Sequence, residues 1–241
     1  GGDDTLYAGD GLHDQLLGGA GADELHGGAG LNTLKGGPGD DVLYGGAGRG
    51  DLWGGDGADE IDAEADVQSL HGGAGDDELF ASSGGNMIQA GAGDDTLTGG
   101  AGFDDLFGYQ GADHLTGGAS SDKLAGMEGD DRLYGGRGAD DVGGDDGDDV
   151  VHGGRGDDYV VSGNRGDDAL YGDGGDDYLI GGPGADELRG GTGQDTLHGG
   201  ADSDTFVFAK GDDDIDIEDF SGSVQQLAPV ALPPAQDQLR I

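Results

Sequence analysis

Residues 18–26 read GGAGADELH, and further blocks of the same form precede and follow them. Each block fits the nine-residue template G-G-x-G-x-D-x-U-x, in which U is a large aliphatic residue. The frame runs from residue 1 to Val207 as one partial and 22 full copies, and two copies, 8–17 and 162–171, contain an extra residue. A period held over this length indicates an architecture in which successive copies stack on one another.

Position eight of the template is apolar throughout. It is Leu, Ile or Val in every copy from Leu6 to Leu197, with Val160 in the copy 153–161, and Phe206 in the last copy. Gly at positions one, two and four permits positive φ and tight turns, and positions seven to nine are expected to form a three-residue strand. Because side chains alternate along a strand, position eight points inward while positions seven and nine face water. The prediction is an all-β, parallel two-sheet solenoid in which two copies of the template, or roughly 18 residues, make one coil.

The composition agrees with an acidic chain rich in turns. Of 241 residues 60 are Gly, and 52 Asp or Glu stand against 10 Lys or Arg, for a net charge of −42. Asp outnumbers Glu 45 to 7, which favours turns over helices. This charge excludes electrostatic binding to nucleic acid or to an anionic membrane, the absence of Cys excludes thiolate metal sites, and no apolar run reaches the roughly 18 residues of a membrane span. Calcium is the expected partner.

The template resembles the calcium-binding nonapeptide of the RTX (repeats-in-toxin) family over about 207 of the 241 residues. The resemblance implies a parallel β-roll in which each calcium ion lies between two turns that are one full coil apart. One turn would give the carbonyls of positions two and four and the position-six carboxylate, and the next turn the carbonyls of positions one and three and its own Asp. Six oxygens, two of them charged, suit calcium. The backbone carbonyls so implied as ligands include those of Gly19, Gly21, Gly36, Gly37, Pro38, Gly39, Gly54, Gly55, Asp56, Gly57, Gly72, Gly73, Ala74, Gly75, Gly91, Gly93, Gly108 and Gln110.

Alternate copies share an edge of the roll, so position six forms two columns. The first column is Asp without exception: Asp4, Asp23, Asp41, Asp59, Asp77, Asp95, Asp113, Asp131, Asp149, Asp168, Asp186 and Asp204. The second column has Asp14, then four consecutive departures, then Asp104, Asp122, Asp140, Asp158, Asp177 and Asp195. The departures are Asn32, Gly50, Gln68 and Asn86. Asp stands on both sides of 11 gaps on the first edge and 5 on the second, so at most about 16 calcium sites are expected.

Folding is expected to require this calcium. Without it, the carboxylates of one edge would stack about one strand spacing apart and repel one another strongly. A chain with this much Gly is also costly to order. We therefore predict an unfolded chain without calcium and a folded calcium form.

Two features have alternative interpretations. The departures from Asn32 to Asn86, near the single Trp53, are either drift on an edge that is not needed or a face shaped for a partner. Position nine of the first column carries seven rings out of twelve residues, which either reflect strand propensity or form a stripe that stacks on sugars or on a neighbouring molecule. These residues are Tyr7, His26, Tyr44, Phe80, Tyr134, His152 and Tyr171.

After Val207 the nonapeptide stops, and alternating apolar residues in 206–208 and 215–217 predict longer strands that cap the last coil. The segment resembles the D-T-F-V-F…I-x-D-F block that closes RTX repeats in secreted bacterial metalloproteases, and 237–241 resembles the strand that follows it. We therefore divide the chain into a repeat domain, 1–207, and a capping segment, 208–241, where the family similarity implies a type I secretion signal region.

No catalytic constellation is present in the sequence. It has no H-E-x-x-H or G-x-S-x-G motif, and four of its His residues are spread along position nine, where they cannot converge on one zinc ion. The leading hypothesis is a non-enzymatic calcium-binding β-roll of a secreted bacterial protein, extracellular or at the cell surface, with calcium and the type I secretion machinery as partners. One alternative is an adhesive rod that binds a glycan or a protein. Another is the C-terminal module of a secreted metalloprotease, lipase or alginate epimerase, since a chain that begins without Met is expected to be part of a longer one.

Overall fold

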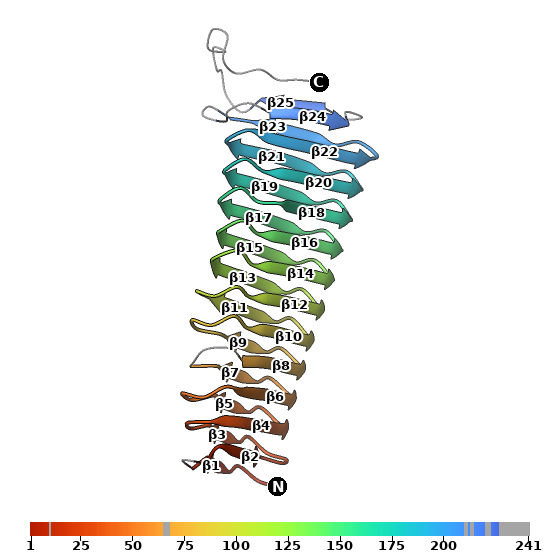
Figure 1. Ribbon diagram of the computed structural model, residues 1–241. Coiled ribbons are helices and arrows are strands. Elements are labelled where there is room, and N and C mark those ends of the chain that lie inside the picture. The colour runs from red at the N-terminus through yellow and green to blue at the C-terminus, as the bar shows by residue number, and fades with distance from the viewer. Residues whose placement is uncertain (10, 65–67, 210–211, 213–214, 220–222, 227–241) are drawn as a thin grey trace. The chain divides into compact units, whose positions relative to one another are not determined.

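A computed structural model describes residues 1–9, 11–64, 68–209, 212, 215–219 and 223–226, in two units, Gly1–Ala119 and Ser120–Ile241. The secondary structure of these described residues is entirely β, as predicted. In each unit, successive strands alternate between two parallel sheets, one of odd-numbered and one of even-numbered strands (Figure 1).

The strands of the first unit lie in two sheets in chain order. The odd-numbered sheet contains β1 (Thr5–Tyr7), β3 (Glu24–His26), β5 (Val42–Tyr44), β7 (Glu60–Asp62), β9 (Glu78–Phe80), β11 (Thr96–Gly100) and β13 (His114–Ala119). The even-numbered sheet contains β2 (His13–Leu17), β4 (Leu31–Pro38), β6 (Gly50–Asp56), β8 (Gln68–Ala74), β10 (Met87–Ala92) and β12 (Asp105–Gln110).

The second unit is built in the same way. Its odd-numbered sheet contains β15 (Arg132–Arg137), β17 (Val150–Arg155), β19 (Ala169–Gly174), β21 (Glu187–Thr192), β23 (Thr205–Phe208) and β25 (Ser223–Gln226). Its even-numbered sheet contains β14 (Lys123–Glu128), β16 (Asp141–Asp146), β18 (Val160–Arg165), β20 (Tyr178–Pro183), β22 (Asp195–Ala201) and β24 (Ile215–Asp219).

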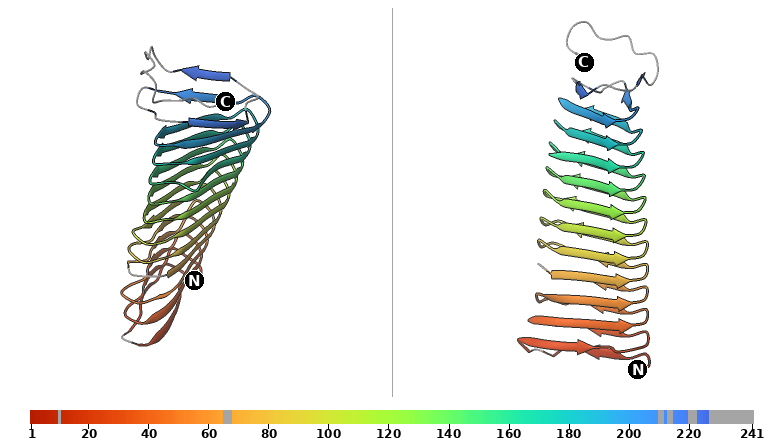
Figure 2. Two further views of the ribbon diagram at one scale, coloured as in Figure 1. Left: turned by 45° about the horizontal axis from the view of Figure 1, so that its top comes forward. Right: turned by 90° about the vertical axis from the view of Figure 1, so that its right-hand side faces the viewer.

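The register of each sheet follows the sequence repeat, because equivalent positions of the template pair with each other. Leu52 pairs with Leu34 on one side and with Leu70 on the other, so that each partner lies two copies of the template away. Figure 2 shows this stacking of parallel strands within each unit from two further directions. The predicted coil, which contains two copies of the template and two strands, is therefore confirmed.

The position-eight side chains form the core between the two sheets. They are buried as predicted, with two exceptions. Leu6, in the first strand, is half-buried, and so is Val160, the residue predicted at position eight of the copy 153–161. The buried set is Leu16, Leu25, Leu34, Leu43, Leu52, Ile61, Leu70, Leu79, Ile88, Leu97, Leu106, Leu115, Leu124, Leu133, Val142, Val151, Val161, Leu170, Leu179, Leu188, Leu197 and Phe206. Burial of this continuous aliphatic ladder is the main apolar stabilisation of each unit.

The position of one extra residue differs from the prediction. Val161, rather than Val160, lies in the core and pairs with the core residues Val142 and Leu179. The added residue therefore lies between Asp158 and Val161, where Tyr159 is 78% exposed, and not in 162–171. A turn has open space for an additional residue, whereas a close-packed core does not.

Most of the described strands are longer than the three residues predicted, although β1, β3, β5, β7 and β9 have three. Eleven run for six residues, from position seven of one copy to position three of the next, as in β13. Gly73 and Gly91, both at position two, have φ of 131° and 129° and still pair with each other in the sheet. Glycine in this extended, positive-φ backbone therefore continues the sheet instead of ending the strand.

Glycine at position one also has a different role from the one predicted. Gly54 is not among the residues with positive φ, but a Cβ built on it would collide with Oδ2 of Asp59 in the same copy. Position one thus leaves room for the acidic side chain of its own turn.

The described residues after Val207 extend the two sheets by one more layer. β24 pairs with β22, with a register shift between Leu197 and His198, and β25 pairs with β23. Residues 237–241, which were expected to form a further strand, lie outside the described part of the chain. Nowhere in the described part is there a helix of the length and apolar character needed to cross a membrane.

Candidate metal sites

The position-six side chains point into the turns at both edges of each unit. Position six directly precedes a strand, and alternation places its side chain on the same side as position eight. From Asp23 to Asp204 in the first column and from Asp104 to Asp195 in the second, every one of these Asp residues is at most 3% exposed. Asp4, in the first turn, is exposed, and Asp14 is half-buried.

One oxygen of most of these buried carboxylates accepts a hydrogen bond within the protein. Oδ1 of Asp59 accepts the backbone N–H of Asp41, one coil earlier, at 2.8 Å, and the same bond recurs at 2.7–3.2 Å along both edges. The position-six residues whose Oδ1 accepts such a bond are Asp23, Asp41, Asp59, Asp77, Asp95, Asp104, Asp113, Asp140, Asp149, Asp158, Asp168, Asp177, Asp186, Asp195 and Asp204. The bonds hold the carboxylates at a fixed height in successive turns.

The second oxygen has no such partner. Within the described residues, Oδ2 is buried and makes no hydrogen bond in Asp14, Asp23, Asp41, Asp59, Asp77, Asp95, Asp140, Asp149, Asp158, Asp168, Asp177 and Asp186. A buried carboxylate oxygen without a partner is costly, and native proteins rarely leave one unsatisfied. A repeated row of such atoms fits a row of bound cations.

The backbone carbonyls around these oxygens face the same gaps between turns. The carbonyls of Asp56 and Ala74, at position three, point back to the preceding turn, where they accept the N–H of Gly39 and Gly57 at 2.7 Å. The carbonyls at positions two and four point toward the next turn. This is seen at Gly57, where an added Cβ would collide with the carbonyl oxygen of Gly39, one coil earlier.

The predicted carbonyl ligands all lie in turns of the first edge of the first unit. An ion there would take most of its oxygens from the backbone, because no three His, Asp or Glu side chains of the described residues converge on one point. Backbone and carboxylate oxygens are the ligands that calcium prefers. The role of each Asp and each carbonyl as a metal ligand stays a prediction.

Electrostatics also favours a cation in these turns. Burial raises the pKa of Asp95 to about 8, although its hydrogen bond with the backbone of Asp77 lowers it, and the charges of Asp113 and Asp77 raise it further. Burial likewise raises the pKa of Asp59 to about 7 and that of Asp177 to about 8. A raised pKa means that the ionised column is unfavourable in the folded chain, and a nearby divalent ion would reverse this effect.

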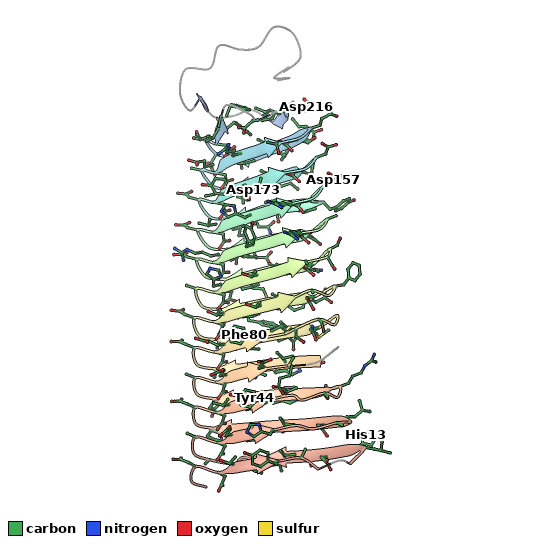
Figure 3. All side chains as sticks on the ribbon, turned by 90° about the vertical axis from the view of Figure 1, so that its left-hand side faces the viewer. His13, Tyr44, Phe80, Asp157, Asp173 and Asp216 are labelled. Atoms are coloured by element: carbon green, nitrogen blue, oxygen red, sulfur yellow. The ribbon has the colours of Figure 1, made fainter. Side chains whose placement is uncertain are left out.

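A second ladder of carboxylates was not predicted. Oδ1 of Asp76, at position five, accepts the N–H of Asp94 one coil later at 2.9 Å, and Oδ1 of Asp94 accepts that of Ala112 at 2.9 Å. These bonds run in the opposite direction to those of position six, and the side chains are exposed. Oδ1 of Asp157, which is labelled in Figure 3, accepts the N–H of Asp176 in the same way. The signal was present in the sequence as the recurring Asp-Asp pairs.

The depleted part of the second edge has a different surface. Asn32 accepts the N–H of Asp14 at 3.3 Å through Oδ1, but Nδ2 is buried without a hydrogen-bond partner in the described part of the chain. A hollow of about 630 Å³ lies along this edge, and its lining includes Leu31, Met87 and Phe103, which are 44–72% exposed. The side chain of Gln68 lies outside the described residues.

Most rings of position nine pack against one another. Tyr7–His26–Tyr44 and His152–Tyr171 are stacked, with centroids 4.5–5.0 Å apart, and Tyr134 is tilted against His152 with centroids 5.8 Å apart. His26 also contacts Glu24, and His152 contacts Asp173, each at 2.8 Å. Tyr44 and Phe80 are labelled in Figure 3. Because neighbouring rings cover one another's faces, which sugar stacking would need, the contacts favour the structural interpretation of this stripe.

Comparison with known families agrees with this geometry. A sequence model of the RTX calcium-binding nonapeptide repeat, which spans four copies, matches residues 17–52, 51–67, 71–106, 107–142, 143–164, 160–188 and 180–215. These matches cover well over half of the chain. No curated protein sequence gives a significant match.

Proposed function

The chain belongs to the family of RTX calcium-binding nonapeptide repeats, and from this premise we propose that calcium bound in its turns is what allows the β-roll to fold. The observation that carries the proposal is the row of buried Oδ2 atoms that have no hydrogen-bond partner in the described chain. Each would contact a cation shared with the next turn. Up to about 16 ions would occupy gaps that have Asp on both sides.

The proposed mechanism couples binding to folding. Without ions, desolvation and mutual repulsion oppose the burial of the ionised position-six columns, as the raised pKa values of Asp59, Asp95 and Asp177 indicate. Each bound ion would lie between two carboxylates and join two turns, so binding in one gap orders the turn needed by the next. Folding is therefore expected to be cooperative in calcium.

The biological role follows from this switch. RTX repeat proteins are typically secreted, and we propose the same for this chain. At low calcium inside the cell it would stay unfolded and exportable by a type I machinery, and outside it would fold. The family is a structural, typically non-catalytic repeat, and we propose a binding and stabilising role, whether alone or beside a catalytic domain.

Far-UV circular dichroism of the full chain during a calcium titration tests the proposal. We expect a coil spectrum in excess chelator and a cooperative change to β structure near the 0.1–1 mM range of extracellular calcium modules. Magnesium at the same concentrations is the control and should fail, because it demands a tighter octahedral shell. A β spectrum already present in chelator would overturn calcium-dependent folding.

A further inference from the structure

The four departures in the second column do not have the same structure. Asn86 is the last of them, and one coil later the column returns to Asp at Asp104. We infer that the side-chain amide of Asn86 takes the place of an ion in the gap between these two turns, so that the row of second-edge calcium sites begins only after Asp104. This inference rests on the proposed function.

The contacts of Asn86 carry the inference. Its Nδ2 donates to the carbonyl oxygen of Gly84 at 2.7 Å and to Oδ1 of Asp104 at 2.9 Å. Its backbone N–H donates to the same Oδ1 at 2.7 Å, which is the bond that recurs along the Asp columns. The side chain is buried, with 4% of the residue exposed.

The two acceptors are those that an ion would contact. Gly84 occupies position four and Asn86 position six of one turn, and Asp104 occupies position six of the next. In the proposed ligand scheme, the position-four carbonyl and the following Asp both bind the ion in this gap. An amide group has two N–H donors, and here it joins the same two oxygens without adding charge.

Asn32 shows that an Asn at position six is not sufficient to form this bridge. Gly50 stands one coil after it, so that no carboxylate is available as an acceptor. Its Nδ2 accordingly has no hydrogen-bond partner in the described chain. The bridge thus forms where the depleted stretch meets the first intact Asp.

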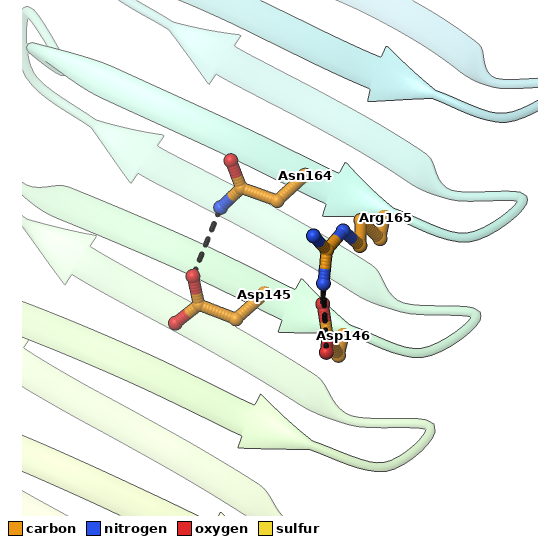
Figure 4. A network of polar contacts seen from close by, with 4 residues as sticks. All are labelled: Asp145, Asp146, Asn164 and Arg165. Carbon is orange, nitrogen blue, oxygen red and sulfur yellow. Dashed lines mark hydrogen bonds and ion pairs between the residues drawn. The ribbon is translucent and has the colours of Figure 1, made fainter.

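Native mass spectrometry of the full chain in saturating calcium tests the inference. Asn86→Asp supplies the missing carboxylate and is expected to bind one ion more than the wild type. Asn164→Asp is the matched control: Nδ2 of Asn164 also donates to an Asp oxygen, Oδ1 of Asp145 at 3.0 Å, but on an exposed strand face (Figure 4), and its ion count should not change. Asn86→Ala, which supplies no ligand, should gain no ion.

A second readout does not require a variant. In calcium-saturated wild type, NMR should show the side-chain NH₂ of Asn86 exchanging with solvent at least tenfold more slowly than that of Asn164. An unchanged ion count in a folded Asn86→Asp variant, or equal exchange of the two amides, would overturn the inference. If Asn86→Asp does not fold, the exchange measurement decides. Wild type that binds no calcium would instead overturn the proposed function.

Discussion

Oδ1 of Asp95 accepts the backbone N–H of Asp77, one coil earlier, at 2.7 Å, while its Oδ2 is buried without a hydrogen bond in the described chain. Its neighbour Asp94 points outward and accepts the N–H of Ala112, one coil later. The two adjacent acids therefore have different roles. Asp94 joins two coils through a hydrogen bond to the backbone alone, whereas Asp95 also has an oxygen placed to share an ion.

This division predicts opposite results for two adjacent substitutions. Asp95→Asn keeps an oxygen that can accept the Asp77 N–H but removes the charge beside two gaps. We expect it to lower the number of bound calcium ions by one or two and to raise the calcium midpoint of folding. Asp94→Asn should leave both unchanged, because its amide oxygen still accepts the Ala112 N–H. Isothermal titration calorimetry measures both quantities, and equal effects of the two variants would contradict the assignment of position six to metal.

Backbone strain predicts a stabilising change at Met127. This residue replaces the position-two Gly of its copy and has φ of 85°, where a side chain costs roughly 1–2 kcal/mol. Met127→Gly removes this strain but adds the roughly 0.5–1 kcal/mol that Gly costs inside a strand, so it is expected to stabilise the calcium form by about 0.5–1 kcal/mol. Met87 is the control: it is exposed on β10 and is not among the positive-φ residues, so Met87→Gly should destabilise by about 0.5–1 kcal/mol. Urea unfolding in saturating calcium measures both, and destabilisation by both would show that strain at Met127 is minor.

Periodicity predicted the sheets, the coil and the core because each copy contributes one apolar residue, such as Leu52, at a fixed phase. It also placed the position-six carboxylates, since Asp59 recurs at a fixed offset from the core residue of its copy, Ile61. It could not choose between Val160 and Val161, because two adjacent valines satisfy the same pattern. The bridge made by Asn86 could not be predicted from the repeat either, because it depends on the direction of one side-chain amide toward a residue one full coil away.

The ambiguity at the added residue can be tested with those two valines. Val161 is fully buried between core residues of neighbouring coils, whereas Val160 is half-buried. We expect Val161→Ala to destabilise the calcium form by about 2 kcal/mol, through lost burial and the cavity left behind. Val160→Ala should cost about 1 kcal/mol or less. Thermal or urea unfolding compares them directly, and a larger loss for Val160→Ala would place the added residue after the strand instead of before it.

The last described coil contains an ion pair that the nonapeptide does not predict. Nη2 of Arg189, at position nine, contacts Oδ1 of Asp212 at 3.0 Å, and the Asp212 side chain is only 5% exposed. Oδ2 of Asp212 accepts the N–H of Ala209 at 2.6 Å, so the carboxylate also contacts the backbone directly after β23. The hydrogen bond to Asp212 raises the pKa of Arg189, although burial lowers it.

Arg189→Gln would leave the buried Asp212 carboxylate without its cation. We expect the free energy of unfolding of the calcium form to fall by about 1–3 kcal/mol. The backbone amides of 215–219 should then exchange with solvent faster than in the wild type. Arg165→Gln is the control, because the pair of Arg165 with Asp146 (Figure 4) is exposed and should contribute less than about 1 kcal/mol. Hydrogen-exchange mass spectrometry in saturating calcium separates the two. If 215–219 exchanges equally in both variants, the pair does not hold the last coil in place.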